Sequence, residues 1–223
     1  MVIASRKLPA CEAVRDALIA GGHEAIAVAC NVSRRPEVDA LVDATLQAWG
    51  GIDIVVANAA ANPHYGALST ITDELWEKTI TANVTSILWL ANRALPIVAE
   101  RGGGSLILMS SISAFLGTAR LGAYAVTKAA EVQLARSLAV EWGARGVRVN
   151  AIAPGVIQTE FARALWEEPE RRKRLERATC LKRVGVPDDI GGVAVFLASE
   201  AGRYVTGQTL VVDGGASITS AIE

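Results

Sequence analysis

Short apolar runs alternate along the chain with longer stretches in which apolar positions recur at helical spacing. The apolar runs predict strands at residues 2–4, 25–29, 52–57, 105–110, 147–152 and 209–212. The stretches between them predict helices at residues 9–21, 35–49, 73–99, 124–144 and 188–199. Because strands and helices alternate, we predict an α/β fold, a doubly wound parallel sheet with helices on both faces.

The organisation of the chain is that of one domain. The run at 52–57 is apolar at positions facing both ways, as a strand buried inside a parallel sheet requires. No internal repeat, linker or low-complexity tract divides residues 1–223, so we predict a single domain over that range. The most polar segment, residues 166–177, is interpreted either as a solvated helix or as a mobile lid over a substrate.

Composition narrows the function classes. The chain of 223 residues is 51% hydrophobic and 20% charged, which is typical of a globular protein and not of a disordered one. Its net charge of −1 offers no electrostatic basis for binding nucleic acid or an anionic membrane. No apolar run approaches the roughly 18 residues of a membrane span. Cys11, Cys30 and Cys180 are scattered, so we expect free thiols and no metal site.

Three polar residues predict a proton-transfer site. Tyr124 and Lys128 stand four residues apart, on one face of the predicted helix, and Ser111 follows the strand before it. The ammonium of Lys128 is expected to favour the phenolate of Tyr124, and Ser111 to hold a substrate oxygen beside it. The alternative is an amphipathic helix on which the two residues are incidental.

Further motifs occur in a fixed order around this trio. They are Asn58-Ala59-Ala60-Ala61 after a predicted strand, Asn83 in the long helix, residues 150–159 with Pro154-Gly155, and residues 211–215 near the end. Together with the trio they resemble the short-chain dehydrogenase/reductase family, from residue 2 to about residue 216. The wording at residues 59–63 and 163–166 is similar to the branch of carbonyl and retinal reductases.

The resemblance implies a Rossmann-type fold and an oxidoreductase that interconverts a carbonyl and an alcohol with a nicotinamide cofactor. It implies that Tyr124 is the general acid or base and that Lys128 lowers the tyrosine pKa and binds the nicotinamide ribose. Ser111 would stabilise charge on the substrate oxygen. Asn83 would hold a water that links Lys128 to solvent, and its alternative is a side-chain bond to its own helix.

The resemblance also implies a set of cofactor contacts beyond Tyr124 and Lys128. These are Arg6, Asn31, Val32, Asn58, Pro154, Gly155, Ile157 and Thr159. Ser5-Arg6-Lys7 carries no acid where NAD-preferring sites place one, and Arg6 is suited to a 2′-phosphate. We therefore expect NADP(H) to be favoured, with NAD(H) possible. A solvated basic turn is the alternative for Arg6.

The expected substrate is a small, fairly apolar carbonyl compound or alcohol. Its pocket is predicted to be formed by Ser111, Phe115, Leu116, Phe161 and Trp166. The resemblance implies a homotetramer built on the helices at residues 73–99 and 124–144 and on the last strand. The ending Ala221-Ile222-Glu223 differs from a peroxisomal address, so we expect a cytoplasmic location.

One part of the family pattern is absent. A sheet of this type opens with a strand, a glycine-rich turn and a helix that together bind the pyrophosphate, but Gly102-Gly103-Gly104 precedes a strand instead. The chain begins where the family's second strand begins, so we expect the fold to lack the first strand and helix, which puts cofactor binding in doubt. A fragment or misplaced start, a natural truncation and a rearranged sheet remain as explanations. The alternative function is an inactive truncated relative that keeps only its interaction surfaces.

Overall fold

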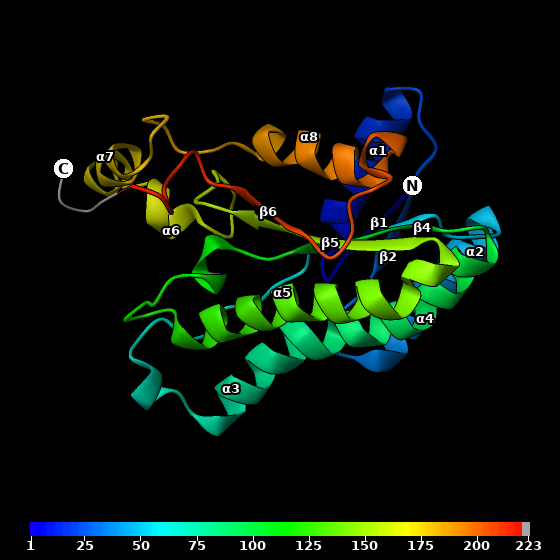
Figure 1. The fold of residues 1–223 in the computed structure, drawn as a ribbon, viewed down its shortest axis with the longest axis horizontal. Coiled ribbons are helices and arrows are strands. Elements are labelled where there is room, and N and C mark those ends of the chain that lie inside the picture. The colour runs from blue at the N-terminus through cyan, green and yellow to red at the C-terminus, as the bar shows by residue number, and fades with distance from the viewer. Residues whose placement is uncertain (220–223) are drawn as a thin grey trace.

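The computed structural model describes residues 1–219, in which strands and helices alternate as predicted (Figure 1). The strands are β1 (Val2–Ser5), β2 (Ile26–Ala29), β3 (Ile54–Ala57), β4 (Gly104–Met109), β5 (Val147–Pro154) and β6 (Thr209–Val212). The α-helices are α1 (Leu8–Ala20), α2 (Arg35–Trp49), α3 (Asp73–Ile80), α4 (Ser86–Glu100), α5 (Gly122–Trp142), α6 (Arg163–Trp166), α7 (Pro169–Ala178) and α8 (Pro187–Ala198). The prediction of a cytoplasmic location is based on residues 221–223, which lie outside the described part.

Proline marks the beginning of four of these helices. Pro9, Pro36, Pro169 and Pro187 each occupy one of the first two helical positions, of α1, α2, α7 and α8 respectively. A proline there forfeits no intrahelical hydrogen bond, and its fixed φ angle already suits the helix. The chain therefore fixes where these helices start through local geometry alone.

A four-stranded parallel sheet forms the centre of the molecule. Its strand order is β3-β4-β5-β6, and all of its pairings are parallel. Leu106, Ile107 and Leu108 of β4 and Val149 of β5 are completely buried. Strands this apolar on both faces are typical of a parallel sheet that is covered on both sides.

Helices cover the two faces of this sheet (Figure 1). Helices α4 and α5 pack on one face, where Leu106 and Leu108 join the larger apolar core. Helix α8 packs on the other face, where Ile107 and Ile152 contact the core around Leu197. Because successive side chains of a strand point to opposite faces, β4 contributes to both cores at once.

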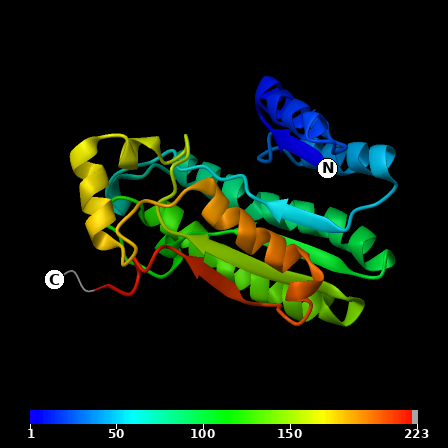
Figure 2. The same cartoon turned by 90° about the horizontal axis from the view of Figure 1, so that it is seen from above.

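The first two strands stand apart from this sheet. β1 and β2 pair in parallel in a separate two-stranded sheet, and α1 packs against both. Figure 2 shows β1 and α1, in blue, set apart from the sheet that begins at β3. Helix α2 joins the two parts by packing on α4, with Arg93 of α4 paired to Asp39 and Asp43 of α2.

The predicted α/β fold with parallel strands and covering helices is confirmed, and among residues 1–219 the parallel strands form two separate sheets. No described strand supplies hydrogen bonds between β1 and β3, so each is an edge. Ile54 and Val56 of β3 are 50% and 46% exposed beside this gap. That a further strand belongs there stays a prediction.

Several predicted boundaries need correction. The predicted helix at residues 73–99 is divided by a π-helical turn at Thr81–Thr85. The polar segment 166–177 forms α7 and the end of the short α6.

Within residues 1–219, no helix combines the length and apolar character that crossing a membrane requires. The three cysteines are free, as predicted.

Candidate active site

The predicted catalytic residues gather at the carboxyl end of the central sheet. Asn58 follows β3, Ser111 follows β4 and Gly155 follows β5, so three parallel strands deliver them to one edge. The first turns of α5 begin at this same edge and carry Tyr124 and Lys128. In open parallel sheets this is the edge where ligands bind.

Tyr124 and Lys128 lie together, as their spacing predicts. The Nζ atom of Lys128 is 5.3 Å from the centre of the Tyr124 ring. Lys128 is only 2% exposed, so it is no incidental surface lysine. The hydroxyl of Ser111 lies close enough to Tyr124 to lower its pKa, which places all three residues in one cluster.

Asn83 ties this cluster to the sheet. Its side chain is completely buried, and it exchanges two hydrogen bonds with the backbone of Ala61: Ala61 N–H donates to Oδ1 at 2.7 Å, and Nδ2 donates to the Ala61 carbonyl at 2.9 Å. Nδ2 also donates to Thr127 Oγ1 at 2.9 Å, next to Lys128 on α5. The alternative that Asn83 bonds only to its own helix is wrong, because its partners come from the loop after β3 and from α5.

Sequence reasoning missed Glu131. This residue lies on α5, three positions after Lys128, and its carboxylate is completely buried. Lys128 Nζ donates to its Oε1 at 2.8 Å and to its Oε2 at 3.1 Å. The signal was present as an acid at i+3 from the lysine, a spacing that places both side chains on one helical face.

The Lys128–Glu131 pair changes the expected electrostatics of Tyr124. Burial, followed by the negative charge of Glu131, raises the pKa of Tyr124 to about 12, while the Ser111 hydroxyl acts in the opposite direction. In the unliganded protein the pKa of Tyr124 thus lies above its usual value of 10, and its lowering by Lys128 stays a prediction. The main physical reason is that burial disfavours the charged phenolate, and the negative charge of Glu131 adds to this effect.

The turn after β5 fits the role of a cofactor contact. Gly155 donates to the Val212 carbonyl at 3.0 Å, and a Cβ atom on Gly155 would lie 2.9 Å from the Asp213 backbone, so the close approach requires glycine here. The backbone N–H groups of Val156 and Ile157 donate to no acceptor among the described residues. Such N–H groups suit a carboxamide oxygen. Thr159 Oγ1 accepts from Ala162 N–H at 3.3 Å, and Pro154 ends β5.

The other predicted cofactor residues lie outside the turn after β5. Asn58 is exposed at the end of β3. Arg6 follows β1, and Asn31 and Val32 lie after β2, beside the separate two-stranded sheet; Asn31 accepts from Ser33 N–H and Arg6 is exposed. Arg6 forms no hydrogen bond or ion pair with a described residue. The residues present therefore fit the nicotinamide and ribose half of a dinucleotide, whereas no glycine-rich turn among residues 1–219 joins a strand to a helix for its pyrophosphate.

Apolar side chains flank the catalytic cluster on its open side. The rings of Phe161 and Tyr124 are 6.2 Å apart with a tilt of 38°. Phe115 and Leu116 follow the short turn after Ser111 and are 49% and 44% exposed. Trp166 of α6 donates through Nε1 to the Thr159 carbonyl at 3.1 Å, which ties α6 to the turn after β5.

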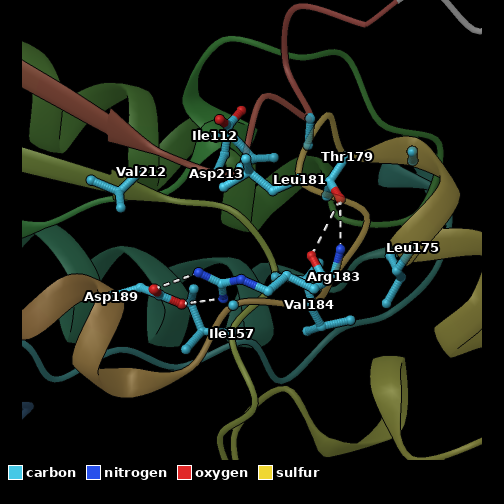
Figure 3. A pocket seen from close by; sticks show the side chains of 15 residues that line it. Ile112, Ile157, Leu175, Thr179, Leu181, Arg183, Val184, Asp189, Val212 and Asp213 are labelled. Atoms are coloured by element: carbon cyan, nitrogen blue, oxygen red, sulfur yellow. Dashed lines mark hydrogen bonds and ion pairs between the residues drawn. The ribbon is translucent and has the colours of Figure 1, made fainter.

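Figure 3 shows a pocket whose lining residues do not include Ser111, Tyr124 or Lys128. Its volume is about 230 Å³, and its lining includes Ile112, which follows Ser111 in the chain, and Val156 and Ile157 of the turn after β5. Arg183 and Asp189 hold its wall through two hydrogen bonds of 2.6 and 2.7 Å. Its remaining lining is mostly apolar, so the chemistry belongs to the open cluster of Ser111, Tyr124 and Lys128.

Metal chemistry has no evident centre in the described part. Across residues 1–219, no three His, Cys, Asp or Glu side chains gather in an arrangement that could hold a metal ion.

Comparisons with known proteins show which family the chain resembles. A protein-family model described as enoyl-(acyl carrier protein) reductase matches residues 1–217. Dehydrogenase/reductase SDR family member 4 of Oryctolagus cuniculus is 39% identical over 216 residues, which cover 97% of this chain and 83% of that relative. This similarity extends over nearly all of the chain.

Solved structures with the same fold include two with bound cofactors. A 7α-hydroxysteroid dehydrogenase complexed with NADH and 7-oxo glycochenodeoxycholic acid has a TM-score of 0.92 and 31% identity, covering 96% of this chain and 83% of its own. A gluconate 5-dehydrogenase from Burkholderia cenocepacia J2315, complexed with NADP and tartrate, has a TM-score of 0.92 and 29% identity, covering 98% and 86%. Both are dehydrogenases.

Proposed function

Because the chain belongs to the short-chain dehydrogenase/reductase family, we propose that it interconverts a carbonyl group and an alcohol with a nicotinamide cofactor. The observation that carries this proposal is the convergence of Ser111, Tyr124 and Lys128 at the carboxyl edge of the sheet. These residues come from two different elements, yet their polar groups share one cluster. The family's oxidoreductase chemistry requires such a cluster.

Tyr124 acts as the general acid in carbonyl reduction. Its pKa of about 12 keeps the hydroxyl protonated near neutral pH, so a proton is available for the substrate oxygen. Ser111 donates to the same oxygen and stabilises the charge that develops there. In alcohol oxidation the proton moves in the opposite direction. The cofactor, when bound, supplies or accepts the hydride.

The proposed cofactor contacts lie at the carboxyl edge of the central sheet. Lys128, Asn58 and the turn at residues 155–159 serve the nicotinamide and its ribose. The related structures contain NADH in one case and NADP in another, so the fold accommodates both. Arg6 favours NADP(H) here, because its exposed guanidinium follows β1 and has no competing acid among the described residues.

The substrate is small and fairly apolar. Phe115, Leu116 and Phe161 expose apolar surface around Tyr124 and provide contact area for an apolar group. Helices α6 and α7 flank this opening as a lid, and their charged outer residues form ion pairs such as Arg163–Glu167 and Arg172–Glu176.

The working assembly is a homotetramer. Leu88 on α4 and Val126 and Val140 on α5 are 41%, 44% and 87% exposed, on the helices that the resemblance assigns to the subunit interface. Val211 of β6 is also exposed. Light scattering coupled to size exclusion measures the mass in solution, and a monomer at micromolar concentration would contradict this assembly.

Tyr124→Phe tests the proposed function. It removes one hydroxyl, so we expect carbonyl reduction to fall by about 10²–10⁴-fold while cofactor affinity stays within a few-fold. Steady-state rates with NADPH across a panel of small ketones and aldehydes measure the effect. Tyr65→Phe is the matched control, because Tyr65 is 60% exposed in a loop. If Tyr124→Phe keeps more than about a tenth of the rate, Tyr124 is not the acid.

A further inference from the structure

The ammonium of Lys128 is fully engaged before any ligand arrives. Besides its two bonds to Glu131, Nζ donates to the Met109 carbonyl at 2.8 Å. A lysine ammonium has three donors, and these three acceptors match them, so a ribose hydroxyl would have to replace one of the two Glu131 bonds. The orientation of Lys128 towards Tyr124 therefore depends on groups that belong neither to cofactor nor to substrate.

Glu131 is the only charged group among these acceptors. Its side chain is 1% exposed, and Lys128 is its ion-pair partner. An unpaired carboxylate at such a depth is strongly unfavourable, so burial has to be compensated by the ammonium. Burial nevertheless raises the pKa of Glu131 to about 7, although Lys128 acts to lower it.

Other charges of the neighbouring elements do not reach this pair. The charged side chains of α3, Asp73, Glu74, Glu77 and Lys78, are exposed to solvent. Arg148 of β5 donates to the carbonyls of Leu197 and Gly202 at the opposite end of the strand, and Arg145 lies over the Trp142 ring. The π-helical turn contributes neutral Asn83, and the turn after β4 contributes neutral Ser111. The charges closest to Tyr124 are therefore those of Lys128 and Glu131.

We propose that Glu131 is a positioning residue of the active site, which fixes the Lys128 ammonium and cancels its field at Tyr124. Burial raises the pKa of Tyr124 and the carboxylate adds to this effect, so the site is set for donating a proton to a carbonyl oxygen. Removing the negative charge leaves the ammonium uncompensated, so the pKa of Tyr124 falls and its phenolate forms at lower pH. The value of this setting for carbonyl reduction rests on the proposed function, whereas the electrostatic coupling does not.

The coupling is measured by NMR titration of protein labelled with ¹³C at the ζ carbon of tyrosine. The chain has three tyrosines, and Tyr65 and Tyr204 are 60% and 100% exposed, so they serve as internal references. The missing signal of Tyr124→Phe assigns Tyr124. In Glu131→Gln we expect the pKa of Tyr124 to fall by about 1 unit or more, as an uncompensated charge nearby requires. Circular dichroism at each pH confirms that the protein is folded.

Glu141→Gln is the matched control, because it makes the same chemical change at an exposed position of α5. It should leave the titration of Tyr124 unchanged. A folded Glu131→Gln protein in which Tyr124 titrates as in the wild type overturns the proposal. A merely structural role of Glu131 would change stability without moving this resonance.

Glu131→Asp covers the case in which the glutamine variant does not fold. The shorter side chain keeps the charge but withdraws it from the ammonium, so we expect the Tyr124 pKa to fall by less than in Glu131→Gln yet measurably. An unchanged Tyr124 in a folded Glu131→Asp protein overturns the proposal equally.

The titration uses neither cofactor nor substrate, so its outcome separates the two hypotheses. A shifted Tyr124 in a protein without reductase activity would leave the coupling intact and refute the proposed function. An active reductase in which the Tyr124 pKa is the same with and without Glu131 would support the proposed function and refute the coupling. In an active protein, Glu131→Gln should also move the pH profile of alcohol oxidation to lower pH, because the base becomes easier to deprotonate.

Discussion

At the scale of single residues, burial decides what each ionisable group can do. Lys128 and Glu131 are buried together, whereas Arg6 is exposed on the separate sheet. The first two are restricted to one geometry, and their charges act strongly on each other because water is excluded. Arg6 remains free to meet an incoming phosphate. Two predictions follow from this contrast.

Arg6→Asp should change the choice of cofactor. The new carboxylate would repel a 2′-phosphate and could accept a hydrogen bond from a 2′-hydroxyl, so the ratio of kcat/KM for NADPH to that for NADH should fall. Losing one charge-assisted bond costs about 1.5–3 kcal/mol, or roughly a 10-fold to 100-fold change in this ratio. Arg203→Asp, at another exposed position, is the control. An unchanged ratio would mean that Arg6 does not meet the cofactor.

Glu131 should make folding stability fall as pH rises towards neutrality. Its pKa is raised from 4.5 to about 7 in the folded protein, which therefore retains a proton that the unfolded chain releases. The contribution is complete below about pH 4.5 and is lost as the pH passes through about 7, a difference of about 3 kcal/mol. Urea unfolding at intervals over this window, compared with Glu131→Gln, isolates it. Parallel pH curves for the two proteins would show that Glu131 does not titrate there.

At the scale of elements, one irregular helical turn connects the sheet to the catalytic helix. Asn83 sits in the π-helical turn between α3 and α4, and single π-turns inside α-helices are frequent at functional sites. From there its amide bridges the loop at Ala61 and Thr127 of α5. This bridge fixes the start of α5, and with it the positions of Tyr124 and Lys128.

Asn83→Leu should destabilise the fold as well as the site. Leucine is similar in size, but it leaves the N–H and carbonyl of Ala61 without their side-chain partner, at about 1–3 kcal/mol for each unsatisfied buried group. We expect the free energy of unfolding in urea to fall by about 2–4 kcal/mol. Asn92→Leu on the exposed side of α4 is the control and should change it by less than about 0.5 kcal/mol. Equal effects of the two substitutions would remove Asn83 from this bridging role.

At the scale of the whole molecule, the division into two sheets has a cost. β1 and β3 are both edges, and exposed edges with apolar side chains pair with other chains. Ile54 and Val56 present such side chains on β3. In the protein as described by residues 1–219, we expect this surface to limit solubility.

Val56→Lys should reduce aggregation without unfolding the protein. Lysine on an edge strand opposes pairing with a second chain, and the side chain at this position is 46% exposed. Static light scattering during concentration should therefore show later onset of aggregates, with stability unchanged within about 0.5 kcal/mol. Val55→Lys is the contrasting variant, since Val55 is 9% exposed and a charge there should unfold the domain. If wild type and Val56→Lys aggregate equally, a surface other than the β3 edge causes the aggregation.

The sequence by itself determined the elements and where the candidate site residues lie along them. Strand and helix periods, prolines at helix starts and the spacing of Ser111, Tyr124 and Lys128 are local properties, expressed within a turn or a strand. They sufficed to predict the α/β class and the family resemblance, which the comparisons confirm. The helix from Arg35 to Trp49 and the strand from Thr209 to Val212 have the predicted bounds.

Only the tertiary structure decided the bridge made by Asn83 and the electrostatics of Tyr124. Each depends on which distant groups meet and on how much water remains between them. A pair such as Lys128 and Glu131 is readable as neighbours on a helix, but its effect on Tyr124 arises from burial against β4. Spacing along a chain specifies which face of a helix or strand a side chain occupies. Hydrogen-bond partners and pKa values depend on three-dimensional packing, which local sequence periodicity does not encode.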